Sequence, residues 1–300
     1  MLVNPAAHNG QGVELARRAL SVFESLGVTG YEVVRTEGAG SATDFAFHLD
    51  SSVDSLIVLG GDGLVHETVN GLMCRDRDDR PLLGVVPLGS GNDYARALGL
   101  PLSVDASVQA LCNGLEACVD VGLCNGQFYA ETLSFGLDAA IALQTMELRK
   151  KTGESGTKLY FHAGIDQLLH HLNTYGYRAL VTDAQGETAE IFGSSIVFAS
   201  QVGPTYGGGF YICPDANLSD GLIDICIAEG PVSVPHAVYV FVRAKNGKHT
   251  HMKPIRMLKA KSMHLEFDEE PPAQIDGEPI LGTTFDIDCV PQALRVIRAS

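Results

Sequence analysis

The chain has 300 residues, of which 21 are Lys or Arg and 36 are Asp or Glu, so its formal net charge is −15. Apolar residues make up 45% of the chain and charged residues 19%, a balance that excludes wholesale disorder and suits about two globular domains. The acidic balance argues against a general nucleic-acid-binding protein and against electrostatic attachment of the whole surface to an acidic membrane.

The N-terminal sequence and the cysteines favour a cytoplasmic protein. The chain reaches Asn4-Pro5 at once, without the basic and apolar regions of a secretory signal, and no window approaches the roughly 20 apolar residues of a transmembrane helix. The seven cysteines are odd in number and include no Cys-x-x-Cys pair, which disfavours a disulfide framework or a zinc site.

The first 120 residues alternate between strand-like and helix-like patterns. Strands are expected at residues 31–35, 55–59 and 82–87, with a short one at Leu2-Val3, and helices at 13–26, 41–49, 64–73 and 104–115. Ser41 is the expected N-cap of the second helix. The continuous apolar run at 55–59 is typical of a strand covered on both faces. The alternation predicts an α/β domain with a parallel sheet.

The pattern changes near residue 120. Asn125-Gly126 lies between strand-like runs at 118–124 and 127–133 and predicts a hairpin, because a type I′ turn needs two positive φ angles. Further strands are expected at 177–183, 191–200, 222–228, 262–267 and 284–289, with helices near 139–150 and 157–173. We predict a mainly antiparallel domain over residues 121–287, with a last strand at about 288–300 that returns to the first domain (1–120).

Glycine-rich loops follow two of the expected strands. Gly60-Gly61-Asp62-Gly63 follows the strand at 55–59, and Gly89-Ser90-Gly91-Asn92-Asp93 follows the strand at 82–87. An α/β sheet binds ligands beyond the carboxyl ends of its strands, and glycines let a phosphate approach backbone N–H groups. Each loop alone could be a plain strand-to-helix turn, but two at neighbouring strand ends favour a phosphate site. Asp62 is a candidate to hold a metal ion or a ribose.

The loops match neither of the common nucleotide-binding motifs. A third, weaker loop runs from Asn4 to Gly12, again between a strand and a helix. None of the three contains the Gly-Lys-[Ser/Thr] of a Walker A loop or a Gly-x-Gly-x-x-Gly fingerprint. A phosphate bound here would therefore not be held in the P-loop or Rossmann manner.

Taken together, the motifs resemble the bacterial lipid kinase family related to diacylglycerol kinases, whose catalytic domain is shared with sphingosine kinases. The matching segments, in chain order, are Asn4-Pro5, residues 60–63 with Glu67 and Asn70-Gly71, and residues 87–93, 135–138, 158–160, 207–209, 213–216, 220–224 and 275–278. The resemblance covers essentially the whole chain. The ordered set is specific, although no single piece of it would be.

The resemblance implies a two-domain kinase that uses ATP and Mg²⁺. ATP would lie on the glycine-rich loops of the α/β domain, and the acceptor lipid would be presented from a C-terminal β-sandwich-like domain. The residues implied to contact ATP or line its cleft are Asn4, Thr36, Gly60, Gly61, Asp62, Gly63, Leu64, His66, Glu67, Gly89, Ser90, Gly91, Asn92 and Asp93. Asp276 would accept the proton of the lipid hydroxyl, with Glu278 beside it. A Mg²⁺ site would use the carbonyls of Asn217 and Leu222 and the carboxylate of Asp220.

The chemistry of these residues suits the implied roles. Phosphoryl transfer depends on positioning and charge neutralisation, for which backbone N–H groups, Mg²⁺ and a carboxylate base suffice. Asp62, Asp276 and Glu278 are oxygen donors of the kind that hard cations prefer. Taken alone, Asp276-Gly277 and Asp220-Gly221 would be read as turns; as parts of the ordered set they favour catalysis and metal binding.

One departure from the family leaves other functions open. The family loop usually reads Gly-Gly-Asp-Gly-Thr, whereas Leu64 occupies the last position here. A hydroxyl is therefore missing, which keeps open a nucleotide-binding regulator without catalysis. The shared Gly-Gly-Asp-Gly loop also keeps open a soluble-substrate kinase akin to NAD kinase.

The leading prediction is an ATP-dependent lipid kinase of phospholipid biosynthesis that converts diacylglycerol to phosphatidic acid. We expect transient contact with a membrane through a local patch such as residues 243–261, which hold seven Lys or Arg and no acidic residue. A solvated hairpin is the alternative for that segment. The sequence is also compatible with a homodimer.

Overall fold

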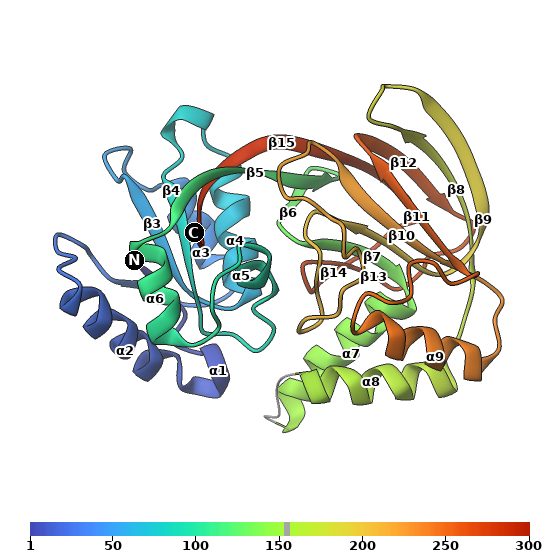
Figure 1. Ribbon diagram of the computed structural model, residues 1–300, viewed down its shortest axis with the longest axis horizontal. Helices are drawn as coiled ribbons and strands as arrows, with labels where there is room; N and C mark the ends of the chain where they lie inside the picture. Colours follow the sequence, from blue (N-terminus) through green and yellow to red (C-terminus); the bar gives the residue numbers. More distant parts are fainter. Residues whose placement is uncertain (153–156) are drawn as a thin grey trace. The chain divides into compact units, whose positions relative to one another are not determined.

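In the computed structural model, which describes residues 1–152 and 157–300, the chain forms two units. The N-terminal unit contains residues 1–119 and 292–300, and the C-terminal unit contains residues 120–291. Two strands, β5 (Leu115–Cys124) and β15 (Thr284–Arg298), each run from one unit into the other. Both chain termini therefore belong to the N-terminal unit (Figure 1).

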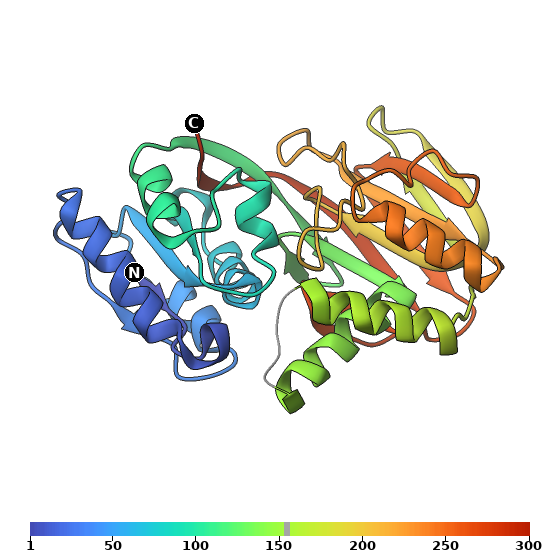
Figure 2. The same cartoon turned by 60° about the horizontal axis from the view of Figure 1, so that its bottom comes forward.

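The N-terminal unit is built on a sheet of parallel strands. Their order is β4 (Leu82–Pro87), β3 (Ser55–Gly60), β1 (Leu2–Val3) and β2 (Val34–Arg35), and the end of β15 pairs with β4 in parallel. The connecting helices are α2 (Gly12–Ser25), α3 (Ser41–Phe47) and α4 (Asp62–Met73). Because such crossovers are right-handed, α2 covers one face of the sheet and α3 and α4 cover the other (Figures 1 and 2).

Shorter elements complete this unit. They are α1 (Ala7–Gly10), the 3₁₀ turn η1 (Arg77–Asp79), α5 (Asp93–Ala97) and α6 (Val104–Cys112), which packs against α2. The β3 residues Leu56, Val58 and Leu59 are at most 1% exposed, because helices cover both faces of the sheet as the continuous apolar sequence predicts.

Three sequence expectations in this unit were wrong in detail. β2 spans Val34–Arg35 rather than 31–35, because its partner β1 has only two residues. Ser41 is the first residue of α3, and Gly40 is the N-cap. The Ser41 hydroxyl instead donates to the Gly38 carbonyl at 2.6 Å and so closes the preceding turn. The helix expected at 104–115 ends at Cys112, since Leu115 already belongs to β5.

The C-terminal unit is mostly antiparallel, as the sequence predicts. Its strands are β6 (Gln127–Tyr129), β7 (Thr132–Gly136), β8 (Tyr175–Thr182), β9 (Thr188–Gln201), β10 (Ile223–Glu229), β11 (Ile255–Ala260), β12 (Ser262–Phe267), β13 (Ala273–Ile275) and β14 (Glu278–Ile280). Their pairing order is β14-β13-β7-β9-β8-β12-β15, and β10 pairs with both β9 and β11. Asn125 (φ 47°) and Gly126 (φ 88°) form the predicted turn between β5 and β6.

Three helices flank these strands. α7 (Leu137–Thr152), α8 (Thr157–His170) and α9 (Val234–Ala244) surround a buried cluster that includes Tyr160, Ile196 and Phe210. The sequence patterns predicted α7 and α8 but not α9. The solvated hairpin given as the alternative for residues 243–261 is wrong, since this segment contains the end of α9, a turn and β11. None of the helices in the described ranges has the length and hydropathy of a membrane span.

Arg80 fixes the last strand to the N-terminal unit. Its guanidinium donates to the carbonyl of Ala293 at 2.7 Å and to the carbonyls of Met73 and Arg75 at 3.2 and 3.0 Å. These carbonyls belong to segments more than 200 residues apart in the chain, so a single half-buried side chain links the end of α4 to β15.

Arg80→Ala is expected to lower the free energy of unfolding by about 2–4 kcal/mol, because it leaves several carbonyls without their charged donor. Urea unfolding of the full chain measures this. Arg17→Ala is the control, since Arg17 lies on the surface of α2 in an exposed pair with Glu14 and should cost at most about 1 kcal/mol. Equal losses in the two variants would contradict the assigned role of Arg80.

Candidate active site

The predicted nucleotide-binding residues follow four neighbouring parallel strands. Asn4 follows β1, Thr36 follows β2, Gly60 ends β3 and Gly89 follows β4 after one residue. Backbone bonds join the strand ends: Asn4 N–H donates to Leu59 O at 3.2 Å, and Leu88 N–H donates to Gly60 O at 2.7 Å. The fold therefore gathers these residues at one edge of the sheet, where α/β proteins bind ligands.

The two glycine-rich loops touch each other through their backbones. A Cβ added to Gly61 would lie 2.8 Å from the Cα of Gly89, and one added to Gly89 would lie 2.4 Å from the Cα of Gly61. Neither approach is possible with a side chain present. In contrast, a Cβ on Gly63 would meet nothing within 4 Å. Gly61 and Gly89 are therefore required for the packing of the loops themselves.

Asp62 connects the two loops. It is the first residue of α4, and its carboxylate accepts the N–H groups of Asn92 at 2.8 Å and Tyr94 at 3.4 Å, at the start of α5. Asn92 has a left-handed backbone (φ 55°), and its side-chain oxygen accepts the N–H of Gly89 at 2.8 Å. Asp62 thus holds the second loop in place from the first.

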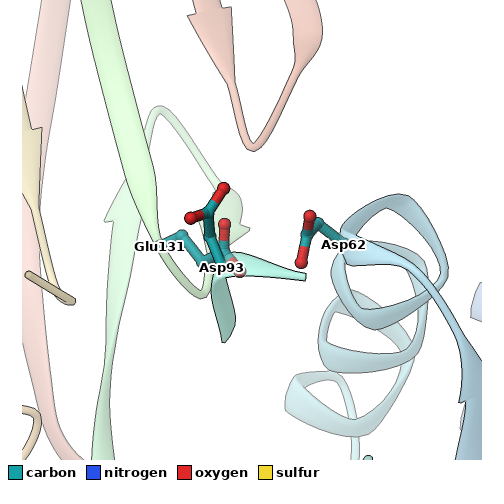
Figure 3. A group of neighbouring side chains, drawn as sticks. All are labelled: Asp62, Asp93 and Glu131. Carbon is teal, nitrogen blue, oxygen red and sulfur yellow. The ribbon is translucent and has the colours of Figure 1, made fainter. Parts of the chain in front are cut away.

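Asp62 and Asp93 offer a pair of carboxylates at this edge of the sheet. Each is the first residue of its helix, α4 or α5 (Figure 3), and a carboxylate oxygen of one lies within 4.8 Å of a carboxylate oxygen of the other. Mg²⁺ is commonly held by one or two carboxylates together with substrate phosphates. The pair therefore fits the ion of Mg-ATP.

The remaining predicted residues of this region point in different directions. Ser90 and Gly91 lie half-buried in the second loop, and His66 is buried on α4. The Glu67 carboxylate accepts the Ala42 N–H of α3 at 3.1 Å, so it contacts the helix start rather than the glycine loop. Thr36 stays beside β1, where its N–H donates to Val3 O at 2.9 Å.

Leu64 is a packing residue. Its side chain is 5% exposed, and its Cδ2 lies so close to Gly60 that a Cβ added there would meet it at 2.6 Å. The Leu64 N–H donates to Gly61 O at 3.0 Å within the turn. The departure from the usual Thr therefore places an apolar side chain in an apolar space.

Asp276 lies at a tight turn in the C-terminal unit. Asp276 (φ 46°) and Gly277 (φ 94°) join β13 to β14, and Glu278 is exposed at the start of β14. The buried Asp276 carboxylate accepts three backbone N–H groups, from Ala130 at 2.7 Å, Glu131 at 3.0 Å and Thr132 at 2.9 Å. These contacts fix its orientation.

The same contacts correct the expected strand at 127–133. The structure has two strands there, since β6 ends at Tyr129 and β7 begins at Thr132. The N–H groups of Ala130 and Glu131 donate to Asp276 instead of to a neighbouring strand. The Asp276 side chain therefore interrupts what the apolar alternation predicts as one strand.

The predicted Mg²⁺ ligands Asn217, Asp220 and Leu222 lie together before β10. Their carbonyl and carboxylate oxygens are of the type that Mg²⁺ prefers. However, the Asp220 carboxylate accepts Lys259 Nζ at 2.8 Å and the Leu222 N–H at 3.2 Å. An ion at this turn would compete with the Lys259 ammonium, so metal binding here stays a prediction.

A cavity lies in the C-terminal unit, although the sequence pattern at 159–172 favours a core helix over a helix that shapes a lipid cavity. It has a volume of about 80 Å³ and lies among α7, α8, α9, β9, β10 and β11, with a lining that is almost wholly apolar. Asp138 and His249 are its buried polar residues, and Tyr160 OH donates to Asp138 Oδ1 at 3.2 Å. Burial raises the pKa of Asp138 to about 7 and lowers the pKa of His249.

Comparison with known proteins identifies the class of this chain. A model of the diacylglycerol kinase catalytic domain matches residues 1–124, and a model of the YegS C-terminal NAD kinase beta sandwich-like domain matches residues 131–298. The chain therefore belongs to the bacterial family of diacylglycerol kinases and YegS-like lipid kinases. This confirms the predicted enzyme class, a lipid kinase, for which the family implies ATP.

Relatives are similar over nearly the whole chain. A protein named diacylglycerol kinase from Staphylococcus saprophyticus is 28% identical over 283 residues, which cover 93% of this chain and 88% of the relative. One of the same name from Mycobacterium tuberculosis is 27% identical, covering 99% of this chain and 94% of the relative. The fold matches a crystal structure of a diacylglycerol kinase from Bacillus anthracis with a TM-score of 0.76 at 21% identity, covering 99% and 95%.

Gly89→Ala tests the contact between the loops. The added Cβ forces the backbones apart, so we expect about 1–3 kcal/mol less stability and at least roughly tenfold weaker ATP binding. Urea unfolding and calorimetric titration with ATP measure the two effects. Gly63→Ala adds the same methyl group in open space and should change stability by no more than about 1 kcal/mol. An unaltered ATP affinity in Gly89→Ala would contradict the assignment of this loop.

Asp138→Asn tests the buried carboxyl. Since burial raises the pKa of Asp138 from 3.8 to about 7, the native state keeps a proton that the unfolded state releases. Stability therefore falls as the pH rises through that interval and levels off above it. Between pH 5 and 8, Asp138→Asn should gain about 1–4 kcal/mol relative to the wild type in urea unfolding. The exposed Asp166→Asn on α8 should show no such gain; parallel pH curves for Asp138→Asn and wild type would refute the shift.

Proposed function

We propose that this chain transfers the γ-phosphoryl group of Mg-ATP to the hydroxyl of a lipid, with diacylglycerol as the acceptor and phosphatidic acid as the product. Family membership supports the reaction class, and the names of the Staphylococcus saprophyticus and Mycobacterium tuberculosis relatives support the acceptor.

The observation that carries the choice of a lipid is the cavity in the C-terminal unit. Its lining is almost entirely aliphatic and aromatic, from residues such as Ile141, Ile196 and Phe241. Such a surface suits an acyl chain, because binding is favourable when the apolar lining and an apolar ligand are both removed from water. A soluble dinucleotide would need several polar partners, and this lining offers few, so the cavity disfavours an NAD kinase-like activity.

The strand-end site of the N-terminal unit supports ATP as the donor. Backbone N–H groups of glycine-rich loops at the start of α4 suit phosphates, and Asp62 and Asp93 suit the accompanying ion. A bound Mg²⁺ would supply neutralisation of the phosphate charge. The protein's part is then positioning, which is the main requirement of phosphoryl transfer.

Asp276 is proposed as the proton acceptor. The lipid oxygen forms the new bond to the γ-phosphorus, the bond from that phosphorus to the bridging oxygen breaks, and ADP leaves with the electron pair. The proton of the lipid hydroxyl passes to the Asp276 carboxylate. The three backbone N–H donors support this role, because they hold the carboxylate in one orientation. Glu278 is placed beside it by the turn.

The packing of Leu64 bears on the regulator alternative. That alternative depends on a missing hydroxyl at this position. The Leu64 side chain faces Gly60 and is buried, which favours a structural role for the position. Catalysis is therefore the better supported reading.

Asp276→Asn should lower kcat for diacylglycerol phosphorylation by about 10²–10⁴-fold, because the amide cannot accept the proton. The measurement is transfer of labelled phosphate from ATP to lipid, with ATP affinity and melting temperature recorded alongside. ATP affinity is expected to stay near the wild-type value.

Asp183→Asn is the matched control. Asp183 also accepts backbone N–H groups at a hairpin turn, from Gln185 at 2.8 Å and Glu187 at 2.9 Å, but at the β8–β9 turn. It should keep full activity. More than about a tenth of wild-type kcat in folded Asp276→Asn would exclude Asp276 as the base. A wild type that binds ATP and phosphorylates no lipid would refute the kinase proposal and favour the regulator.

A further inference from the structure

The helix α9 is apolar on its inner face and mostly apolar on its outer face. Its inner face covers the cavity through Ala237, Phe241 and Ala244, and the Phe241 ring lies 5.1 Å from that of Phe210. Only His236 and Arg243 among its eleven residues are clearly polar. A surface helix normally carries mainly polar residues on its outer side, so an outer face with so few of them needs an explanation.

The outer face of α9 exposes large apolar side chains. Tyr239 is 56% exposed and Val242 is 46% exposed, and their spacing of three residues places them on the same side of the helix. α8 lies beside α9 in both views (Figures 1 and 2) and adds Leu169, which is 54% exposed. The Phe161 ring of α8 lies 5.7 Å from the Phe241 ring, so the two helices are in direct contact.

The segment around this surface has an unusual charge. Residues 231–261 contain seven of the 21 Lys and Arg residues of the chain and no Asp or Glu, whereas the rest holds 14 basic and 36 acidic residues. Lys245 and Lys259 are engaged inside the unit, with Gly208 O and with Asp220. Lys248 and Lys253, in the turn after α9, are exposed. A local positive surface thus accompanies the apolar face on a strongly acidic protein.

We propose that the outer face of α9, with Leu169 of α8 and the lysines that follow α9, docks on the surface of a membrane that contains anionic lipids. Exposed Tyr and Val side chains can enter the headgroup region, and Lys residues beside them attract anionic headgroups. The charge favours a membrane over a second copy of this chain, because a two-fold symmetric dimer through this face would bring the basic segment 231–261 against itself. The inference rests on the proposed lipid kinase function for the reason to visit a membrane.

Docking in this way would place the lipid source next to the cavity. α9 is one helix thick, with the cavity on one side and the proposed membrane surface on the other. A diacylglycerol molecule would then travel about the width of a helix, roughly 10 Å, from the bilayer to the apolar lining.

The test is co-sedimentation of the full chain with vesicles of phosphatidylcholine alone and vesicles that also contain phosphatidylglycerol. The wild type should bind the anionic vesicles more tightly, with an affinity that falls as salt rises. The double variant Tyr239→Ser/Val242→Ser should bind at least about tenfold more weakly. Lys248→Gln/Lys253→Gln should reduce the preference for anionic vesicles. Phe192→Ser, which removes a 75% exposed ring on β9, is the control and should bind like the wild type.

Activity separates this proposal from the proposed function. The Tyr239→Ser/Val242→Ser variant should lose activity on diacylglycerol embedded in vesicles and keep it on a short-chain diacylglycerol dissolved in buffer. Wild type that binds vesicles but phosphorylates neither substrate refutes the kinase while upholding the docking surface. Equal vesicle binding by wild type and the double variant overturns the docking proposal. The docking proposal is also overturned if the wild type does not bind vesicles and instead forms a dimer in solution through this face. A wild-type dimer together with a monomeric double variant would show this.

Discussion

The contact between two glycine-rich loops is the constraint on which the proposed nucleotide site depends. Neighbouring parallel strands lie about 4.8 Å apart, so loops that leave β3 and β4 at the same edge must pass each other closely. Gly61 and Gly89 make that passage possible, because an added Cβ on either would meet the backbone of the other. Once the backbones touch, the Asp62 carboxylate reaches the Asn92 and Tyr94 N–H groups and fixes the start of α5. The same contact brings the carboxylates of Asp62 and Asp93 near each other. The packing of the loops therefore also determines where these two negative charges lie.

The fold of the N-terminal unit is predictable from the sequence because the patterns that mark its strands, turns and helices are local. A continuous apolar run followed by glycine and a helical pattern predicts a covered strand, a tight turn and a helix, and β3 and α4 confirm it. What remained hidden were contacts between distant segments. The family resemblance implies that Glu67 contacts ATP or lines its cleft, whereas in the structure its carboxylate accepts the Ala42 N–H of α3. Leu64 looks like a lost phosphate contact, yet its side chain packs against Gly60.

The sequence predicts that the C-terminal half is mainly antiparallel, but it does not predict which strands pair, and the reason is physical. Its strands pair with partners far along the chain, as β7 does with β9 and β13, and no local pattern encodes such pairing. Asp276 illustrates the limit: the turn at Asp276-Gly277 is visible in the sequence, but the three N–H donors come from residues about 145 positions earlier. The cavity is hard to predict for the same reason, since its lining comes from six separate elements. α9 was missed because its eleven residues are mostly apolar, so they show little of the alternation between apolar and polar faces that marks a surface helix.

The exposed apolar side chains of α9 and the charge of the chain constrain how a lipid kinase can reach its substrate. A net charge of −15 repels an anionic bilayer, so contact has to be made where the charge reverses locally. Residues 231–261 provide that reversal and carry exposed apolar side chains within the same segment. A few such groups give weak, salt-sensitive binding, which suits an enzyme that must leave the surface again. Phosphorylation of a neutral lipid would add negative charge to the membrane below this patch. Attraction would therefore grow where product accumulates, and the acidic remainder of the surface would oppose it, which keeps the contact local and reversible.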